Sequence, residues 1–110
     1  MFMQNKKLNS ELICSLNFKE VSRIENSLQK EILYSNEYFN PDFSSEFSGI
    51  IVNAIISNTF GSSGEDRWML KVPSAFSNPR LRGFDSSIDI NSVEELEIQI
   101  SKIKEAVGLN

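Results

Sequence analysis

The sequence predicts one small α+β domain: an antiparallel sheet of about three short strands, packed by a helix in the N-terminal half and by a C-terminal helix. The chain has 110 residues, 40% hydrophobic and 24% charged, which suits one core and not two. Stretches of alternating apolar residues, typical of strands, are mixed with stretches in which apolar residues recur every three or four positions, typical of helices. We expect residues 1–10 to be polar and mobile and residues 11–110 to form the domain.

The N-terminal half contributes one strand and one helix to this prediction. Apolar residues alternate over residues 12–16 and indicate a short strand. Asn17 and Glu20 then have the spacing of a capping box, so a helix is expected from about Phe18 to Tyr34. Its apolar face would consist of Phe18, Val21, Ile24, Leu28 and Ile32.

The middle of the chain is ambiguous. Residues 35–42 contain two asparagines and a proline, which predict a loop. Apolar residues over 43–55 match a helical stripe, and we favour a helix there. Gly49 and the β-branched residues of 50–56 favour a buried strand instead, so the sequence leaves helix and strand open for residues 49–60.

The C-terminal part gives clearer signals. Residues 61–64 are Gly-Ser-Ser-Gly and indicate a turn, and residues 67–72 then alternate in polarity and predict a strand. Residues 74–83 have the composition of a loop, and a brief strand is expected over residues 87–90.

The last helix is the most strongly predicted element. Ser92 and Glu95 form a capping box, and Gly108 stops the helix. Its apolar stripe consists of Val93, Leu96, Ile100, Ile103 and Val107. A secretion chaperone would dimerise through such a stripe, whereas packing on the core of its own chain is the favoured interpretation.

Most catalytic and metal chemistry is excluded by composition. The chain has no histidine and one cysteine, Cys14, so histidine-based catalysis, disulfide frameworks and transition-metal sites are not expected. Cys14 lies in the first expected strand, where we expect it to be buried. Carboxylates alone could act at Glu65, Asp66, Asp85 and Asp89, the last two with Glu94 as possible ligands of a hard cation, but a solvated surface is favoured. We therefore expect no enzyme activity, metal or cofactor.

Membranes and nucleic acids are not expected as partners. The chain lacks an apolar run of about 18 residues and has no signal-peptide core at its start, so we expect a cytoplasmic protein. Its only basic and aromatic stretch consists of Arg67, Lys71, Phe76, Arg80, Arg82 and Phe84. Four cations on a protein of net charge −4 are too few for nonspecific binding to phosphates.

An acidic and aromatic segment is the favoured binding site. No lysine or arginine lies between Glu31 and Asp66, and this block holds five of the aromatic residues within positions 34–47. Aromatic rings supply contact area and carboxylates steer a basic partner. The expected partner-binding residues are Glu37, Tyr38, Phe39, Asp42 and Glu46. Phe43 and Phe47 would belong to the core, which leaves Tyr38 and Phe39 near the surface.

In size, acidity, α+β pattern and lack of catalytic residues, the chain resembles bacterial toxin-immunity proteins, although no motif carries the resemblance. It implies a non-catalytic inhibitor that binds one basic toxin, such as a nuclease, in a one-to-one complex. Two alternatives remain: a secretion-type chaperone or assembly adaptor, and a carboxylate-dependent enzyme in which at least two of the four acids named above converge in a pocket with raised pKa values. The sequence does not specify the partner or the oligomeric state.

Overall fold

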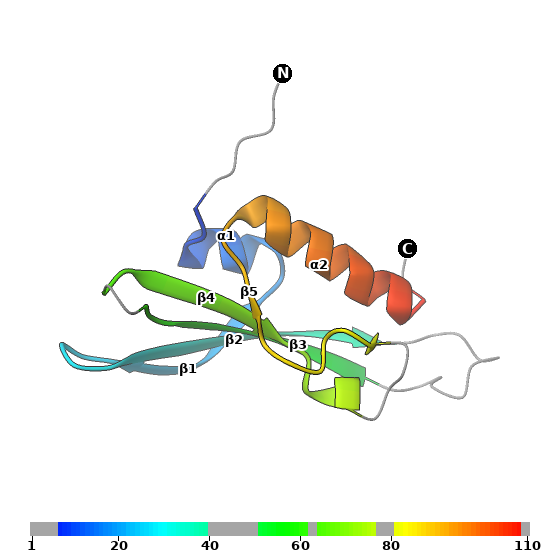
Figure 1. Ribbon diagram of the computed structural model, residues 1–110, viewed down its shortest axis with the longest axis horizontal. Coiled ribbons are helices and arrows are strands. Elements are labelled where there is room, and N and C mark those ends of the chain that lie inside the picture. The colour runs from blue at the N-terminus through cyan, green and yellow to red at the C-terminus, as the bar shows by residue number, and fades with distance from the viewer. Residues whose placement is uncertain (1–6, 40–50, 62–63, 77–80, 109–110) are drawn as a thin grey trace, which may run out of the picture.

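The computed structural model describes residues 7–39, 51–61, 64–76 and 81–108, and within them it is an α+β fold with two layers (Figure 1). The elements in chain order are α1 (Ser10–Ser15), β1 (Lys19–Glu25), β2 (Lys30–Phe39), β3 (Ile51–Phe60), β4 (Asp66–Lys71), the 3-10 helix η1 (Pro73–Phe76), β5 (Ile88–Asp89) and α2 (Val93–Ala106). The α+β class is confirmed, and the described sheet has five strands where about three were expected.

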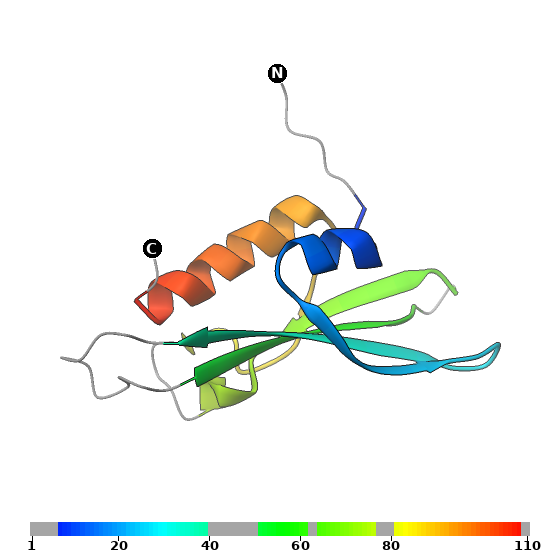
Figure 2. The same cartoon turned by 180° about the vertical axis from the view of Figure 1, so that it is seen from behind.

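The strands follow one another across a single antiparallel sheet in the order β1-β2-β3-β4-β5. Both α-helices lie on the same side of this sheet, as the two opposite views show (Figures 1 and 2). Within the described residues, the other side of the sheet carries no α-helix. This arrangement gives every long strand one side that faces the helices and one that faces away from them.

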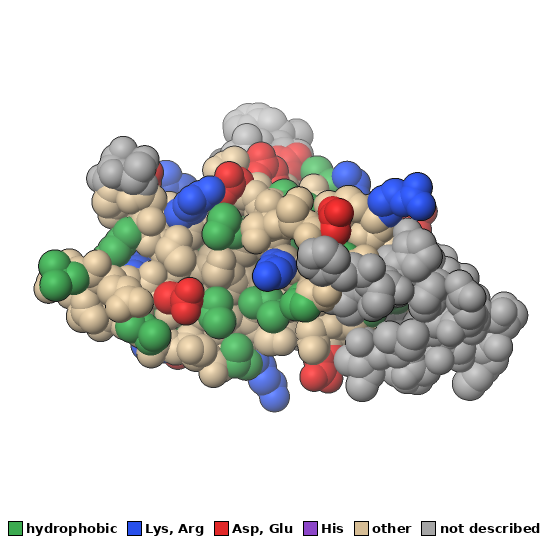
Figure 3. All heavy atoms as spheres, turned by 60° about the horizontal axis from the view of Figure 1, so that its bottom comes forward, with side chains coloured by type: hydrophobic (Ala, Val, Ile, Leu, Met, Phe, Trp, Pro, Cys, Tyr) green, Lys and Arg blue, Asp and Glu red, His purple; other side chains and the backbone are tan. Residues whose placement is uncertain are grey.

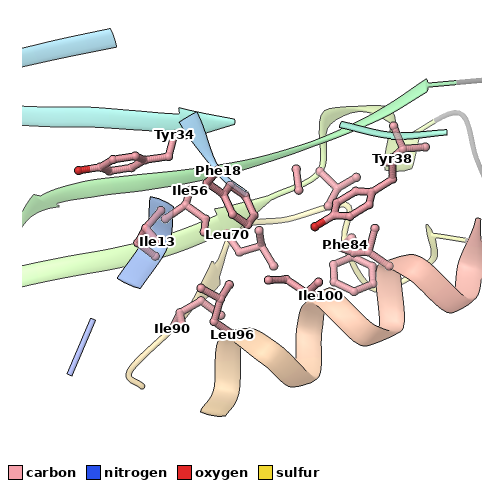
Figure 4. Packing of buried hydrophobic residues seen from close by; sticks show 14 of the residues in the cluster. Ile13, Phe18, Tyr34, Tyr38, Ile56, Leu70, Phe84, Ile90, Leu96 and Ile100 are labelled. Carbon is pink, nitrogen blue, oxygen red and sulfur yellow. The ribbon is translucent and has the colours of Figure 1, made fainter. Parts of the chain in front are cut away.

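The core lies between the sheet and the helices. Alternate residues of β2, β3 and β4 point towards the helices, and Tyr34, Ile56 and Leu70 are fully buried there (Figure 4). Leu96 and Ile103 of α2 are also fully buried. The rings of Tyr34 and Trp68 lie 6.0 Å apart between centroids, within the range of favourable aromatic contacts.

The C-terminal elements confirm the predictions made for them. Strand β4 buries Trp68 and Leu70 on one side, and β5 lies within the expected segment 87–90. The Ser92 hydroxyl accepts a hydrogen bond from the Glu95 amide, as an N-cap should. The Glu95 carboxylate accepts from the amide of Asn91, one residue before the cap. The apolar stripe of α2 packs on its own sheet, as favoured.

The strand predicted over residues 12–16 is wrong, because this segment forms helix α1. The Asn9 side chain accepts a hydrogen bond from the Leu12 amide and caps the helix, a signal that the alternation of apolar residues concealed. The helix buries Ile13 and leaves Cys14 exposed, so the expected burial of the thiol is also wrong. Helix α1 begins within the segment 1–10 that was expected to be mobile, and Leu8 is buried just before it.

The helix predicted over residues 18–34 is also wrong, because this segment forms β1, a turn and most of β2. Of its expected apolar face, only Phe18 and Ile32 are buried. Asn17 has a φ of 71°, which does not suit an N-cap, and Glu20 pairs with Arg23 instead of closing a capping box. The helical spacing of apolar residues was coincidental.

The alternatives left open for residues 49–60 are decided for their described part. Residues 51–60 are strand β3 rather than helix, with Val52, Ala54 and Ile56 buried between two neighbouring strands. The loop expected over residues 35–42 is wrong for residues 35–39, which continue β2. The expected turn at 61–64 joins β3 to β4, and Gly64 adopts a φ of 85° that favours glycine.

Candidate functional site

The side of the sheet turned away from the helices carries no described α-helix (Figures 1 and 2). We call it the uncovered face. Strand alternation and pairing place on it the following residues: Lys19, Ser22 and Ile24 of β1; Glu31, Leu33, Ser35 and Glu37 of β2; Asn53, Ile55, Ser57 and Thr59 of β3; Arg67, Met69 and Lys71 of β4; and Asp89 of β5. A β-bulge between Glu20 and Ser22 leaves Val21 without a pairing partner.

The centre of the uncovered face is apolar. Leu33 and Met69 lie in one cross-strand row on either side of Ser57, and Ile55 lies in the next row. All three apolar side chains are half-buried although neither described α-helix covers them. Figure 3 shows hydrophobic side chains recurring across this face, with charged side chains between and around them. An apolar centre surrounded by polar groups is the usual anatomy of a protein–protein interface.

Charges on the uncovered face are balanced, but only one pair of described side chains is joined. Arg67 Nε donates to Asp89 Oδ1 at 3.1 Å. Glu31 and Glu37, both on β2 and both exposed, make no ion pair with another described residue. The described acids of the acidic block on β2 therefore point away from the helices, where a partner could reach them.

Strand β1 differs from the other long strands in which side of the sheet carries its polar side chains. On β2, β3 and β4 the buried apolar side chains face the helices, whereas on β1 the helix side carries Glu20, Arg23 and Glu25. Arg23 donates to Glu20 at 2.6 Å and to Glu25 at 2.5 Å. The hydrogen bond from Arg23 lowers the pKa of Glu20, and the same bond is the main cause that raises the pKa of Arg23.

The structure separates the expected partner-binding residues. Glu37 is exposed on the uncovered face, as a contact residue should be. Tyr38 is 5% exposed and points from β2 towards α2 and Phe84, so its expected place near the surface is wrong (Figure 4). Burial raises the pKa of Tyr38, although a hydrogen bond from Asn36 acts in the opposite direction. Phe39 ends β2, its side chain lies outside the described set, and Asp42 and Glu46 lie outside the described residues.

Three of the four carboxylates considered for catalysis do approach one another. Glu65, Asp66 and Asp89 line a pocket of about 680 Å³ at the outer edge of β4, together with Trp68, whereas Asp85 does not. Asp66 is paired with Lys30 and Asp89 with Arg67, and both carboxylates are more than half exposed. A carboxyl group acting as a catalytic acid at neutral pH usually needs burial to keep its proton. Asp66 and Asp89 do not have such burial.

Other candidate groups are dispersed. Among the described residues, no group of three or more cysteine and carboxylate side chains could hold a metal ion. In the basic stretch, Arg67 is paired, Lys71 lies on the uncovered face, Phe84 is buried in the core, and Arg80 lies outside the described residues. Neither α-helix of the described chain has the length and hydropathy needed to cross a membrane.

Comparison of the chain with protein-family models, curated proteins and solved structures gave no match. The function of the uncovered face is therefore inferred from its own residues. Sequence reasoning missed its apolar residues: Ile24, Leu33, Ile55 and Met69. Met69 lies between Trp68 and Leu70, so strand alternation puts it on the opposite side of β4, and this spacing is a sequence signal for an apolar outer face.

Proposed function

We propose that this protein is a non-catalytic binding module, an immunity-type inhibitor that neutralises a basic toxin such as a nuclease through its uncovered face. The observation that carries the proposal is an apolar centre on a side of the sheet that neither α-helix covers. Apolar side chains in such a place are only partly buried by their neighbours within their own chain. Burying them against a partner contributes about 25 cal/mol for each Å² removed from water.

The charge distribution supports a basic partner. The protein carries a net charge of −4, so it attracts cations at long range. Glu31 and Glu37 put two exposed carboxylates on the uncovered face, where Lys19 and Lys71 also lie, so the attraction to a basic partner comes from the net charge of the whole protein. Association with a basic protein should therefore be fast at low ionic strength and should slow as salt screens these charges.

The experiment introduces one bulky charge at the centre of the uncovered face. Ser57→Arg places a guanidinium between Leu33 and Met69 without entering the core. Ser101→Arg makes the same chemical change on the exposed surface of α2 and is the matched control. Tagged wild-type protein and both variants are expressed in the native cells, and the captured complexes are weighed by native mass spectrometry.

We expect wild type and Ser101→Arg to retain one dominant basic protein in a one-to-one complex, and Ser57→Arg to lose it. Growth arrest caused by the isolated partner should be relieved by wild type and by the control, but not by Ser57→Arg. Equal circular dichroism of all three proteins verifies folding. An acidic partner, a complex unaffected by Ser57→Arg, or a partner whose toxicity is not relieved would contradict the proposal.

The chaperone alternative loses its expected dimerisation surface. Leu96, Ile100 and Ile103 of α2 are buried in the core of their own chain and are not free to pair with a second copy. The enzyme alternative is weakened by the exposed, ion-paired carboxylates described above. The native mass measurement separates the chaperone from the proposed inhibitor, because a chaperone of this kind forms a stable homodimer.

A further inference from the structure

Strand β1 contributes almost nothing to the core. All seven of its residues are exposed, and Glu20, Arg23 and Glu25 lie on the helix side, where β2, β3 and β4 bury apolar groups. Val21 is 61% and Ile24 44% exposed, with Ile24 on the uncovered face and Val21 at the bulge beside it. A bulge changes the direction of side chains along a strand, and here it shifts Ile24 to the side without helices.

The turn after β1 presents a third apolar side chain. Leu28 is 92% exposed at the tip of the hairpin that joins β1 to β2. Three hydrogen bonds fix this turn. The Asn26 side-chain oxygen Oδ1 accepts from the backbone amides of Leu28 and Gln29 at 2.8 Å each. The backbone amide of Asn26 donates to the backbone carbonyl of Gln29 at 2.8 Å. Leucine is not a residue that tight turns favour, so the turn itself does not account for it.

We infer that the β1–β2 hairpin is the part of the uncovered face that gives the interaction its specificity, with Leu28 inserted into an apolar pocket of the partner. The inference rests on the proposed function. Of the five large hydrophobic residues that are exposed in the described part of the chain, Val21, Ile24 and Leu28 lie on this one hairpin. Single exposed apolar residues are common on proteins, whereas several on one element mark an interaction site.

The neighbouring charges define the kind of partner. Glu31 lies directly across from Ile24 on the uncovered face and forms no ion pair with another described residue. The partner that fits is a folded protein with an apolar pocket of leucine size, flanked by a lysine or arginine that reaches Glu31. A turn already held by hydrogen bonds loses little conformational freedom on binding, so the contact area contributes more fully to affinity.

Site-specific photo-crosslinking in the native cells tests the inference, because it joins the partner covalently to a chosen position and the adduct is then identified by mass spectrometry. A p-benzoylphenylalanine is introduced in place of Leu28 at the hairpin tip, in place of Ser57 at the centre of the uncovered face, or in place of Ile98. Ile98 is 51% exposed on α2, on the helix side of the molecule, and serves as the control position. We expect positions 28 and 57 to give an adduct with the same protein and position 98 to give none.

The possible outcomes separate the two proposals. An adduct from position 57 without one from position 28 overturns the role of the hairpin and leaves the proposed function intact. The absence of adducts from both positions contradicts both. An adduct with a second copy of this chain, with lipid, or with the same proteins from positions 28 and 98 overturns the inference as well.

The partner identified from the adduct is then purified, and its affinity for unlabelled variants of this chain tests whether the Leu28 side chain inserts into it. Leu28→Ala should weaken binding by about 10- to 100-fold, the range expected when a buried leucine side chain is lost, and Ile98→Ala should leave affinity unchanged within about twofold. Asn26→Ala should weaken binding by loosening the turn, and Asn26→Asp should restore it because the carboxylate accepts the same two amide hydrogen bonds. Unchanged affinity in Leu28→Ala would overturn the inference.

Discussion

Truncating Leu96 tests whether the stripe of α2 belongs to the core of its own chain or to an interface between copies. Leu96 is fully buried, whereas Ile98 on the same helix is 51% exposed. Leu96→Ala removes three carbon atoms, worth about 2.4 kcal/mol at 0.8 kcal/mol per buried methylene, and leaves a cavity that adds to the loss. We therefore expect the free energy of unfolding to fall by about 3 kcal/mol. Ile98→Ala should cost less than about 0.5 kcal/mol.

Urea denaturation followed by the fluorescence of Trp68, the one tryptophan of the chain, measures this loss. Trp68 is 7% exposed, so its emission should change when the sheet and the helices separate. With a slope of about 2 kcal/mol per molar urea, the midpoint should fall by about 1.5 M in Leu96→Ala. Runs at two protein concentrations should coincide. A loss below about 1 kcal/mol, or a midpoint that rises with protein concentration, would refute the packing described here and favour a dimer through α2.

Three further predictions concern single residues. Burial raises the pKa of the Tyr38 hydroxyl, so as pH rises the unfolded chain loses this proton before the folded one does. The free energy of unfolding should therefore be retained below the ordinary tyrosine pKa of about 10 and should fall as pH rises above it. Urea midpoints measured from pH 8 to 11 should show a smaller fall in Tyr38→Phe. Asn17, with its φ of 71°, should tolerate replacement by glycine within about 0.5 kcal/mol, whereas Asn17→Ala should lose about 1 kcal/mol in the same denaturation assay, and equal stability of the two variants would refute the argument. The Tyr34 hydroxyl is buried without a hydrogen-bond partner among the described residues, so Tyr34→Phe should raise the thermal midpoint, and a loss of about 1 kcal/mol or more would contradict this expectation.

The candidate site was predictable only in part, and Glu37 and Tyr38 show why. These two residues are neighbours on β2, so they point to opposite sides of the sheet. Composition suggested that both lie at a contact surface, because an acid and an aromatic ring suit one. The pairing of β2 with β3 puts Tyr38 on the same side as Val52, and because the helices cover that side, Tyr38 lies in the core and Glu37 on the uncovered face. Sequence spacing alone carries no such information.

Strand β1 is the clearest case in which local pattern and structure disagree. The spacing of Phe18, Val21 and Ile24 matches one side of a helix, but in the structure Phe18 is buried in the core and Ile24 is exposed on the uncovered face. Local propensity is a weak guide where the pairing partner lies outside the segment. The pairing of β1 with β2 overrode the helical pattern, and no single segment of the sequence records that pairing.

The sequence by itself determined α2 and β4. Ser92 and Glu95 fix the start of α2 through contacts within a few residues, and alternation over β4 places Trp68 and Leu70 together on one side. Only the tertiary structure decided that both α-helices cover one side of the sheet, since that choice depends on contacts between residues far apart in the chain. It is this choice that leaves an apolar face without a covering helix among the described residues.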